Sequence, residues 1–390
     1  MEEALNFTAP PRPVAVPAIE RELTQLWRSL GEAREAEGPA VMRASVANLV
    51  AFAPTPAHGA HAAETLAQVM RIHPCRAILL QVQPDLPGDE TRAAVALATQ
   101  TVGGSQMGCE YIALSANGED EDQLPGLTLP LLITDLPTFL WWLGDPPFGS
   151  EGFVRLAESA DRLVIDSAEF ANPLSTFTEL AVEVATYGQR TIFSDLNWAR
   201  LTPWRSLVAS LFDSPDWRAH LDQLDTIDVE LGGAGAGAPA NPITAFLILG
   251  WLASRLGWSV EKRAVKLSGG SLGITFRAGR RPIAAQVNFA PAAPPGRLSL
   301  LHVRAAWIAA APSFLVTRAY DSARAETRVT VGEAEPIVRL AHYEHRSEAE
   351  QLAEEMEQLG RDRVYEESLQ VAETIRGMLH VELFVPGAGG

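Results

Sequence analysis

Short apolar segments alternate with segments of helical periodicity through the first half of the chain. Apolar runs typical of strands occupy residues 44–52, 77–82, 111–114, 139–143, 163–165 and 191–193. Helical segments are expected at residues 19–30, 59–73, 87–104, 152–160, 173–187 and 203–212. Parallel strands need a crossover segment between them, usually a helix, so this order predicts a mainly parallel sheet with helices on both faces. The fold expected for this part of the chain is α/β.

The second half of the chain follows a different pattern. After a short strand at 226–231 and a helix at about 242–256, strands are expected at residues 259–267, 272–278, 283–289, 298–304, 314–318 and 325–331 with no helix between them. Successive strands of this kind form antiparallel hairpins. Two charged helices, at about 346–359 and 362–379, follow these strands. We therefore predict an α/β domain over residues 1–215 and an α+β domain with a C-terminal helical pair over residues 216–390.

The length and charge of the chain narrow the classes of function. Its 390 residues exceed what one hydrophobic core usually organises, which supports two domains. A net charge of −17 opposes binding to nucleic acid or to an anionic membrane, because both are negatively charged. No uncharged apolar run is long enough to span a bilayer, and the N-terminal MEEALNF is acidic where a secretory signal would be basic. We expect a cytoplasmic protein whose partner is neutral, locally basic or apolar.

Three segments rich in tryptophan and arginine are the strongest candidates for a functional surface. They read LLITDLPTFLWWLGDPPF at 131–148, SADRLVIDS at 159–167 and DLNWARLTPWR at 195–205. Tryptophan and arginine are the residues most enriched where protein interfaces concentrate their binding energy. The predicted partner-binding residues are Trp141, Trp142, Trp198, Arg200, Trp204 and Arg205. Composition alone favours the alternative that these tryptophans form a hydrophobic core.

Local chemistry suggests how some of these side chains are held. Thr202 is a suitable N-cap and Pro203 is suited to the first helical position, so Trp204 and Arg205 are expected to project from a rigid helix start. If Trp141 and Trp142 lie on a strand, they point to opposite faces of the sheet. Only one of these two side chains can then join a surface patch, and the other belongs to the core.

The three segments together, in this order, resemble the signature of the OpcA family of glucose-6-phosphate dehydrogenase assembly proteins. ILGWLASRLGW at 248–258 is similar to a helical segment of that family. EEMEQLGRDRVYEESL at 354–369 resembles its C-terminal helical pair, although Gly360 and Arg361 depart from the usual turn. The resemblance implies a non-catalytic assembly factor and allosteric activator that binds glucose-6-phosphate dehydrogenase in the oxidative pentose phosphate pathway. It implies no cofactor and no catalytic residue of its own.

An enzyme or small-ligand-binding protein is the alternative function. Asp145, Asp166 and Asp195 each follow an expected strand, and ligands of open α/β sheets bind at that edge. Three carboxylates could hold a metal or act as a general base. The simpler interpretation is that they form turns and caps, since their oxygens accept backbone N–H groups. No GxSxG, HExxH or GxxxxGK[ST] motif supports catalysis, and the GxGxxA match at 235–240 is interrupted by Pro239.

The chain contains two cysteines, Cys75 and Cys109, each next to an expected strand. They are too few for a disulfide framework or a zinc site. The simpler interpretation is two buried free thiols. The alternative is that the two lie close together and act as a thiol switch, which requires their Cα atoms to lie within about 7 Å.

Overall fold

The structure of the chain is a computed structural model. It describes residues 6–7, 10–35, 41–87, 91–102, 105–117, 121–188, 190–232, 241–261, 266–268, 271–290, 297–304, 311–319, 322–358 and 360–379. These residues form two compact units, each built from several stretches of the chain. The first unit comprises residues 1–171, 183–196 and 346–361, and the second comprises residues 172–182, 197–345 and 362–390. We describe each unit by itself.

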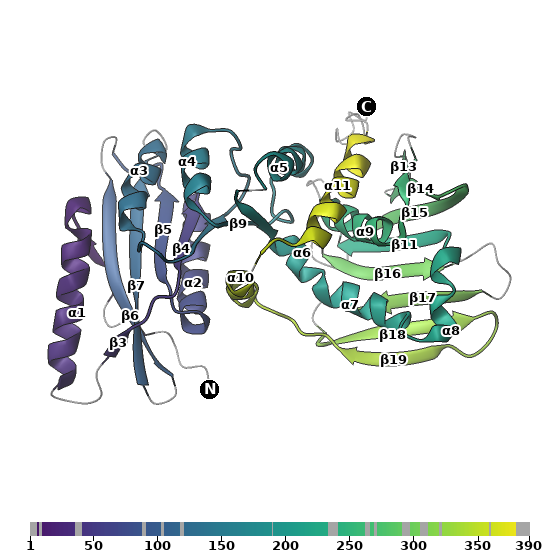
Figure 1. Cartoon of the computed structure of the whole chain (residues 1–390), viewed down its shortest axis with the longest axis horizontal. Helices are drawn as coiled ribbons and strands as arrows, with labels where there is room; N and C mark the ends of the chain where they lie inside the picture. Colours follow the sequence, from purple (N-terminus) through teal and green to yellow (C-terminus); the bar gives the residue numbers. More distant parts are fainter. Residues whose placement is uncertain are drawn as a thin grey trace, which may run out of the picture. The chain divides into compact units, whose positions relative to one another are not determined.

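The first unit contains a ten-stranded sheet in the order β1-β6-β7-β5-β4-β8-β9-β10, with β2 beside β6 and β3 beside β7 (Figure 1). Its strands are β1 (Asn6–Phe7), β2 (Arg12–Val14), β3 (Val41–Arg43), β4 (Asn48–Ala53), β5 (Arg76–Val82), β6 (Arg92–Val102), β7 (Ser105–Ala116), β8 (Thr138–Trp142), β9 (Arg162–Ile165) and β10 (Ile192–Asp195). Pairing is parallel from β7 through β10, while β6 is antiparallel to β7. This confirms the predicted mainly parallel sheet.

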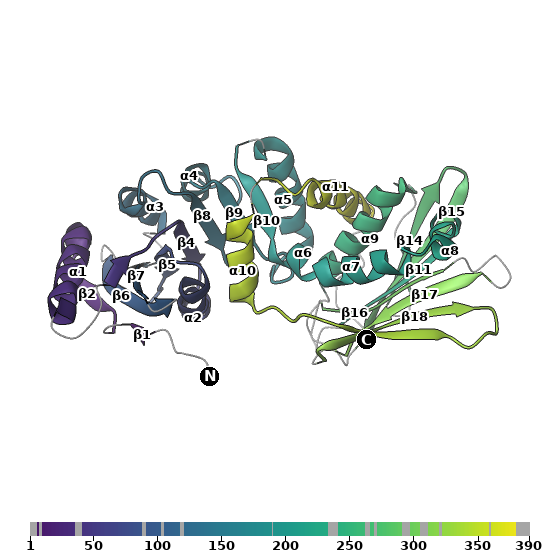
Figure 2. The same ribbon diagram turned by 60° about the horizontal axis from the view of Figure 1, so that its bottom comes forward.

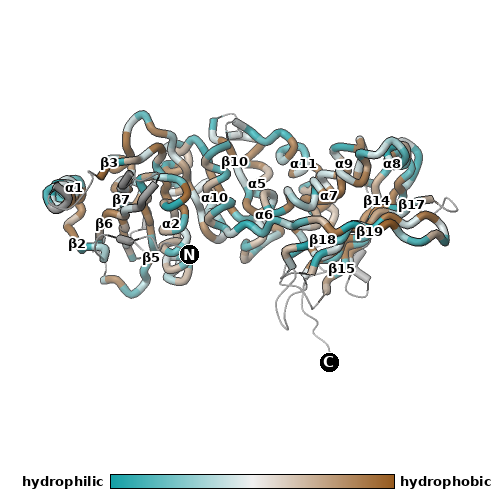
Figure 3. Tube along the Cα trace, turned by 90° about the horizontal axis from the view of Figure 1, so that it is seen from below, coloured by the Kyte–Doolittle hydropathy of each residue, from teal (hydrophilic) through white to brown (hydrophobic). Residues whose placement is uncertain are grey.

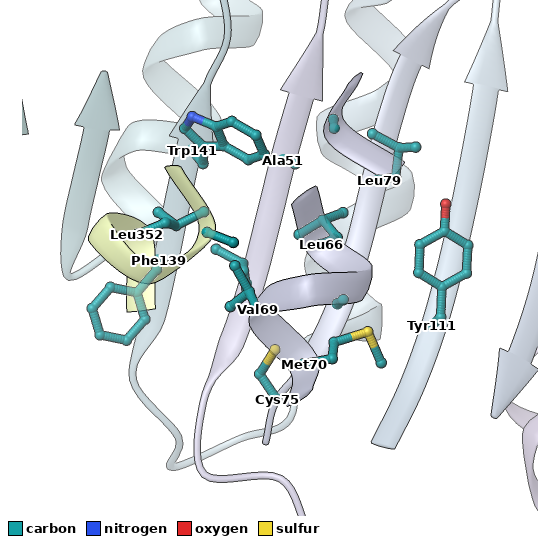
Figure 4. Close-up of a cluster of buried hydrophobic side chains, with 14 of the residues drawn as sticks. Ala51, Leu66, Val69, Met70, Cys75, Leu79, Tyr111, Phe139, Trp141 and Leu352 are labelled. Carbon is teal, nitrogen blue, oxygen red and sulfur yellow. The ribbon is translucent and has the colours of Figure 1, made fainter. Parts of the chain in front are cut away.

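Helices cover both faces of this sheet. One face packs against α2 (Pro56–Ile72), which in turn contacts α10 (Glu348–Glu357). The other elements that contact the sheet or one another are α1 (Ile19–Glu35), α3 (Leu124–Thr128) and α4 (Glu151–Ser159). Figure 4 shows the core on the α2 side, where Leu66, Val69 and Trp141 lie together with Leu352 of α10. Strands buried on both faces carry continuous apolar runs, and β4 and β8 are buried at every position.

The predicted helix at residues 87–104 is wrong. Residues 92–102 form β6, which pairs with β7 along eleven successive residues and with β1 and β2 on its other side. The segment RAAVALATQTV is rich in alanine, the strongest helix former, which favoured a helix from local propensity. Pairing with neighbouring strands overrides this preference, because strand stability depends on tertiary context.

The second unit contains a nine-stranded sheet in the order β12-β14-β15-β11-β16-β17-β18-β19, with β13 beside β14 (Figure 1). Its strands are β11 (Thr226–Gly232), β12 (Ser259–Val260), β13 (Lys266–Ser268), β14 (Ser271–Ala278), β15 (Arg281–Ala290), β16 (Leu298–Arg304), β17 (Pro312–Thr317), β18 (Arg324–Val331) and β19 (Ile337–His342). All pairings are antiparallel except that of β11 with β15. Gly279, with φ of +61°, lies in the turn between β14 and β15. β19 was not predicted.

The helices of the second unit include a closely packed pair. The unit contains helices α6 (Leu196–Arg200), α7 (Thr202–Leu211), α8 (Pro215–Arg218), α9 (Ile243–Leu256) and α11 (Arg363–Gly377). It also contains part of α5 (Pro173–Tyr187), because the division between the two units falls after residue 182. Helices α9 and α11 lie side by side (Figure 2). Gly250 of α9 faces the backbone of Ser368, so closely that a side chain there would collide with the carbonyl oxygen. Glycine is therefore required at this crossing.

The observed units differ in outline from the two predicted sequence domains. Residue 215 lies within the second unit. Helix α10 belongs to the first unit and packs on α2, whereas α11 belongs to the second and packs on α9. The division at residue 215 stays a prediction about independent domains. Hydrophobic and hydrophilic residues alternate along helices such as α7, as expected for a helix with one buried face (Figure 3), whereas α9 is buried along most of its length.

Candidate partner-binding residues and the carboxylate edge

Trp141 and Trp142 are both buried in β8, with 2% and 3% of their surfaces exposed. They point to opposite faces of the sheet, as strand alternation requires. Trp141 belongs to the core on the α2 side (Figure 4). The His61 ring meets it in an edge-to-face arrangement, with ring centroids 6.2 Å apart. Trp142 stacks on Phe52 with ring centroids 3.9 Å apart and meets Phe153 of α4 edge-on. Aromatic pairs of this kind add to the energy of burial, so both indoles stabilise the sheet.

Trp198 connects α6 to the start of α11 within the second unit. Its indole nitrogen donates to Asp362 Oδ2 at 2.8 Å, and its ring packs against Tyr365. Asp362 is also the N-cap of α11, since its Oδ1 accepts from the backbone N–H of Tyr365. The guanidinium of Arg205 lies over the Trp198 ring, 3.5 Å from its centroid, and donates to the Trp198 carbonyl oxygen. The segment at 195–205 therefore holds the N-terminus of α11 in place.

Trp204 is buried in α7, with 2% of its surface exposed, and meets Tyr343 edge-on. Burial raises the pKa of Tyr343, and a hydrogen bond with Trp204 opposes that shift. The predicted N-cap is wrong by one residue. Leu201 is the N-cap, while Thr202 is the first helical residue and its hydroxyl accepts from Arg205. Because all four predicted tryptophans are buried, the partly exposed members of the predicted set are Arg200 and Arg205.

The three aspartates of the alternative enzyme site are engaged by turns of the first unit. Asp195 accepts hydrogen bonds from the backbone N–H and hydroxyl of Ser167, at 3.0 and 2.6 Å. Asp166 accepts from the backbone N–H of Ala168, and Asp145 from that of Ala171. These contacts are the turn-forming role that the simpler interpretation of the sequence assigned. In the described residues no cluster of three or more His, Cys, Asp or Glu side chains could hold a metal.

Cys75 and Cys109 are free, buried and close together in the core of the first unit. The Cys109 thiol donates to the Ala44 carbonyl oxygen and also interacts with the backbone of Cys75. Burial raises the pKa of Cys109 to about 11 and that of Cys75 still further, with the neighbouring thiol adding to the shift. The thiolate is the nucleophile of cysteine chemistry, so both thiols are in the unreactive form near neutral pH.

Two buried arginines at the starts of parallel strands have structural roles that the sequence did not predict. Arg76 donates to Glu110 from Nε at 2.7 Å and to Glu20 of α1 from Nη1 at 2.7 Å. Glu110 also accepts from the Trp27 indole at 2.6 Å and pairs with Arg43 at 2.7 Å. This network ties α1 to the sheet. A charged residue directly before an apolar run was the available signal, and it does not reveal the partner.

Arg162 makes the second network, at the start of β9. Its guanidinium donates to Ser194 Oγ at 2.5 Å and to the carbonyl oxygens of Gln358 and Gly360, which follow α10. Glu355 lies 3.4 Å from Nη1 and supplies the opposite charge. The arginine of the SADRLVIDS segment thus fastens the end of α10 to the sheet, which is a structural role for part of the sequence signature.

Two domain descriptions of one family match most of the chain. The glucose-6-phosphate dehydrogenase subunit N-terminal domain matches residues 67–182, and the corresponding C-terminal domain matches residues 191–369. Both halves of the fold described above thus carry the sequence features of a single family. The chain belongs to the OpcA family.

Curated relatives come from cyanobacteria and bear the provisional name OxPP cycle protein OpcA. The protein of Nostoc punctiforme is 41% identical over 152 residues, which are 38% of this chain and 30% of the relative. That of Synechocystis is 31% identical over 189 residues, which are 48% of this chain and 38% of the relative. The matched region spans less than half the length of either relative.

Solved structures with a similar arrangement are more distant in sequence. A protein of Erwinia carotovora atroseptica, provisionally named an oxidoreductase, has a TM-score of 0.46 at 8% identity and covers 87% of this chain and 99% of that chain. An oxidoreductase domain protein of Kribbella flavida has a TM-score of 0.42 at 8% identity, and the match covers 86% of this chain and 90% of that chain.

No helix in the described part of the chain combines the length and apolar character needed to cross a bilayer.

Proposed function

We propose that this chain binds glucose-6-phosphate dehydrogenase, favours its assembled state and raises its activity. The observation that supports this proposal is the match of both parts of the chain to domains described as those of a glucose-6-phosphate dehydrogenase subunit. The name of the cyanobacterial relatives places those proteins in the oxidative pentose phosphate cycle. We also propose that the protein is cytoplasmic. Because the chain carries a net charge of −17, we propose that it binds neither nucleic acid nor anionic membranes.

The chain acts in this proposal without catalysing a reaction itself and without a cofactor. The carboxylates of the alternative enzyme site, Asp145, Asp166 and Asp195, accept hydrogen bonds from turn residues. A binding protein activates its partner when it binds the active oligomer more tightly than the dissociated or inactive form. The equilibrium then shifts by that difference in affinity, and no chemistry by the binder is needed.

For the contact residues we propose Arg200 and Arg205, with Trp198 holding Arg205 in position. Arg205 lies over the Trp198 ring and donates to the Trp198 carbonyl oxygen of α6 and to the Thr202 hydroxyl at the start of α7. A side chain ordered in this way loses little conformational entropy on binding, which is a property of interface hot spots. Because the tryptophans are buried, we propose that they stabilise the fold rather than contact the dehydrogenase directly.

The test mixes the purified chain with the dehydrogenase of the same organism. Co-elution in size-exclusion chromatography is expected, together with a lower KM or slower oligomer dissociation of the dehydrogenase. Arg205→Glu should weaken the complex by about tenfold or more, the effect of removing a modest hot spot. Arg280→Glu makes the same change of charge at an exposed turn of the second unit and serves as the control.

Two outcomes contradict the proposal. If the dehydrogenase elutes identically and has identical kinetics with and without a molar excess of the chain, the dehydrogenase is not its partner. Turnover of sugar phosphates with NAD or NADP by the chain alone would favour the enzyme alternative. Melting temperatures of both variants must accompany the affinities, because Arg205 also contacts Trp198 and its loss can disturb α7.

A further inference from the structure

β19 (Ile337–His342) is an unpaired edge of the second sheet. It pairs with β18 in six successive residue pairs with no break in register. It ends the strand order, and within the described residues no strand pairs with its other side (Figure 1). An edge strand presents a row of backbone N–H and C=O groups that can accept another strand.

The strand has only some of the features by which proteins usually protect such an edge. The sequence IVRLAH contains no proline and no lysine and pairs with β18 without a bulge, although Arg339 is charged and Pro336 directly precedes the strand. Ile337, Val338 and Leu340 are 49%, 47% and 64% exposed. Strands of this sheet such as β17 and β18 instead alternate between buried and partly exposed residues. An apolar, regular and accessible edge of this kind favours the addition of a further strand.

Charges of opposite sign lie in the turn before β19 and on β19 itself. Glu333 and Glu335, in that turn, are exposed, and no ion pair of theirs occurs within the described part of the chain. Arg339, in the middle of β19, is also exposed, and Arg324 of β18 lies directly opposite His342 at its end. An acidic turn therefore precedes a strand that carries a positive charge, and Glu344 follows that strand.

We propose that β19 pairs antiparallel with β19 of a second copy of this chain, forming a homodimer about a two-fold axis. Antiparallel pairing of identical strands brings the acidic turn before one β19 towards Arg339 of the other. A register centred on Arg339 would set two like charges directly opposite, which is destabilising. A register centred on Val338 sets Ile337 opposite Arg339 and brings Glu335 diagonally beside Arg339 of the other copy, within reach of long side chains. In this register Leu340 lies opposite Pro336, which has no N–H to donate but whose carbonyl oxygen can accept from the Leu340 N–H. The interface is then self-complementary, as a two-fold contact must be.

The experiment measures the mass of the full chain across a concentration series by sedimentation or light scattering. We expect a concentration-dependent dimer. Leu340→Lys should weaken dimerisation by about tenfold or more, because edge lysines block strand pairing. Since Leu340 is 64% exposed, the melting temperature of the dilute protein should stay the same. Met42→Lys changes a residue that is 61% exposed in the first unit and should leave the dimer intact.

A charge exchange identifies the occupant of the edge. Glu335→Arg and Arg339→Glu should each weaken the dimer, because like charges then face each other across the axis. The double variant should restore it, since both signs are reversed together; rescue within one chain is a signature of self-pairing. A parent protein that remains monomeric overturns the proposal, as does a dimer unaffected by Leu340→Lys. If the parent is monomeric but Leu340→Lys abolishes co-elution with the dehydrogenase, the edge serves that partner instead. This inference does not depend on the proposed function.

Discussion

The two sheets differ in how their side chains are shared between core and solvent. In the first unit, every residue of β4 and β8 is buried, because helices cover both faces of a mainly parallel sheet. In the second unit, β17 and β18 alternate between buried and partly exposed residues, and β19 is exposed almost throughout. Two neighbouring residues of β4 or β8 should therefore contribute similarly to stability. In β17 or β18 the buried residue of such a pair should contribute more than its partly exposed neighbour. In the second sheet the strand order leaves β19 as an accessible edge strand.

The largest expected effect tests this difference directly. Trp141→Ala and Trp142→Ala should each lower the free energy of unfolding by about 3 to 5 kcal/mol, because both neighbours lie in the core. In β17, Phe314→Ala should cost about as much, whereas Leu315→Ala should cost less than about 1 kcal/mol, since its side chain faces away from the core. Denaturant unfolding measures all four. Equal losses for Phe314 and Leu315 would contradict the comparison.

The buried ion pair of the first unit gives a second large effect. Arg76→Met leaves the Glu110 carboxylate in the core without its main partner and should cost about 3 kcal/mol or more. The double variant Arg76→Met/Glu110→Met should be more stable than the single variant, because no uncompensated charge remains. Arg43→Met is the control, because the Arg43 side chain is 52% exposed and should contribute at most about 1 kcal/mol. A double variant less stable than the single one would contradict this account.

The helix pair of the second unit gives an intermediate effect. Gly250→Ala would place a methyl group against the Ser368 carbonyl, so the backbones of α9 and α11 must move apart. We expect a loss of about 1 to 3 kcal/mol from this overpacking. Gly377→Ala, in α11 with no neighbour near its added methyl group, should be neutral or slightly stabilising, because alanine favours helix. Thermal unfolding distinguishes the two, and equal melting temperatures would show that the helices separate freely.

The smallest effect concerns the thiols of the first unit. Burial raises the pKa of Cys109 to about 11, so iodoacetamide should modify the native protein at neutral pH no faster than it unfolds. The unfolded thiol ionises near pH 9.0 while the folded one does not. The contribution of the Cys109 thiol to the free energy of unfolding is therefore fully present below pH 9.0 and is lost as the pH rises towards 11. Mass spectrometry of native and denatured samples measures the labelling, and rapid native labelling would support the thiol switch.

Several elements followed from the sequence alone because their signals are local. The continuous apolar runs of β4 and β8 and the helix-free series after residue 258 indicated the two kinds of sheet, since strand environment is written in the period of hydrophobic residues. The resemblance of the tryptophan-rich segments gave the family, which the domain matches show. Helix α5 begins and ends at the predicted residues.

The tertiary structure decided the rest, because it depends on which distant residues meet. The alanine-rich β6 is a strand through its pairing with β7, which local propensity could not reveal. Tryptophan and arginine are typical of both interfaces and cores, so only packing placed Trp198 and Trp204 inside, against Asp362 and Tyr343. The partners of Arg76 and Arg162 lie far away in sequence, and charge pairing leaves no periodic pattern. Which strand forms the edge of a sheet is likewise a property of the complete strand order, and that order left β19 accessible.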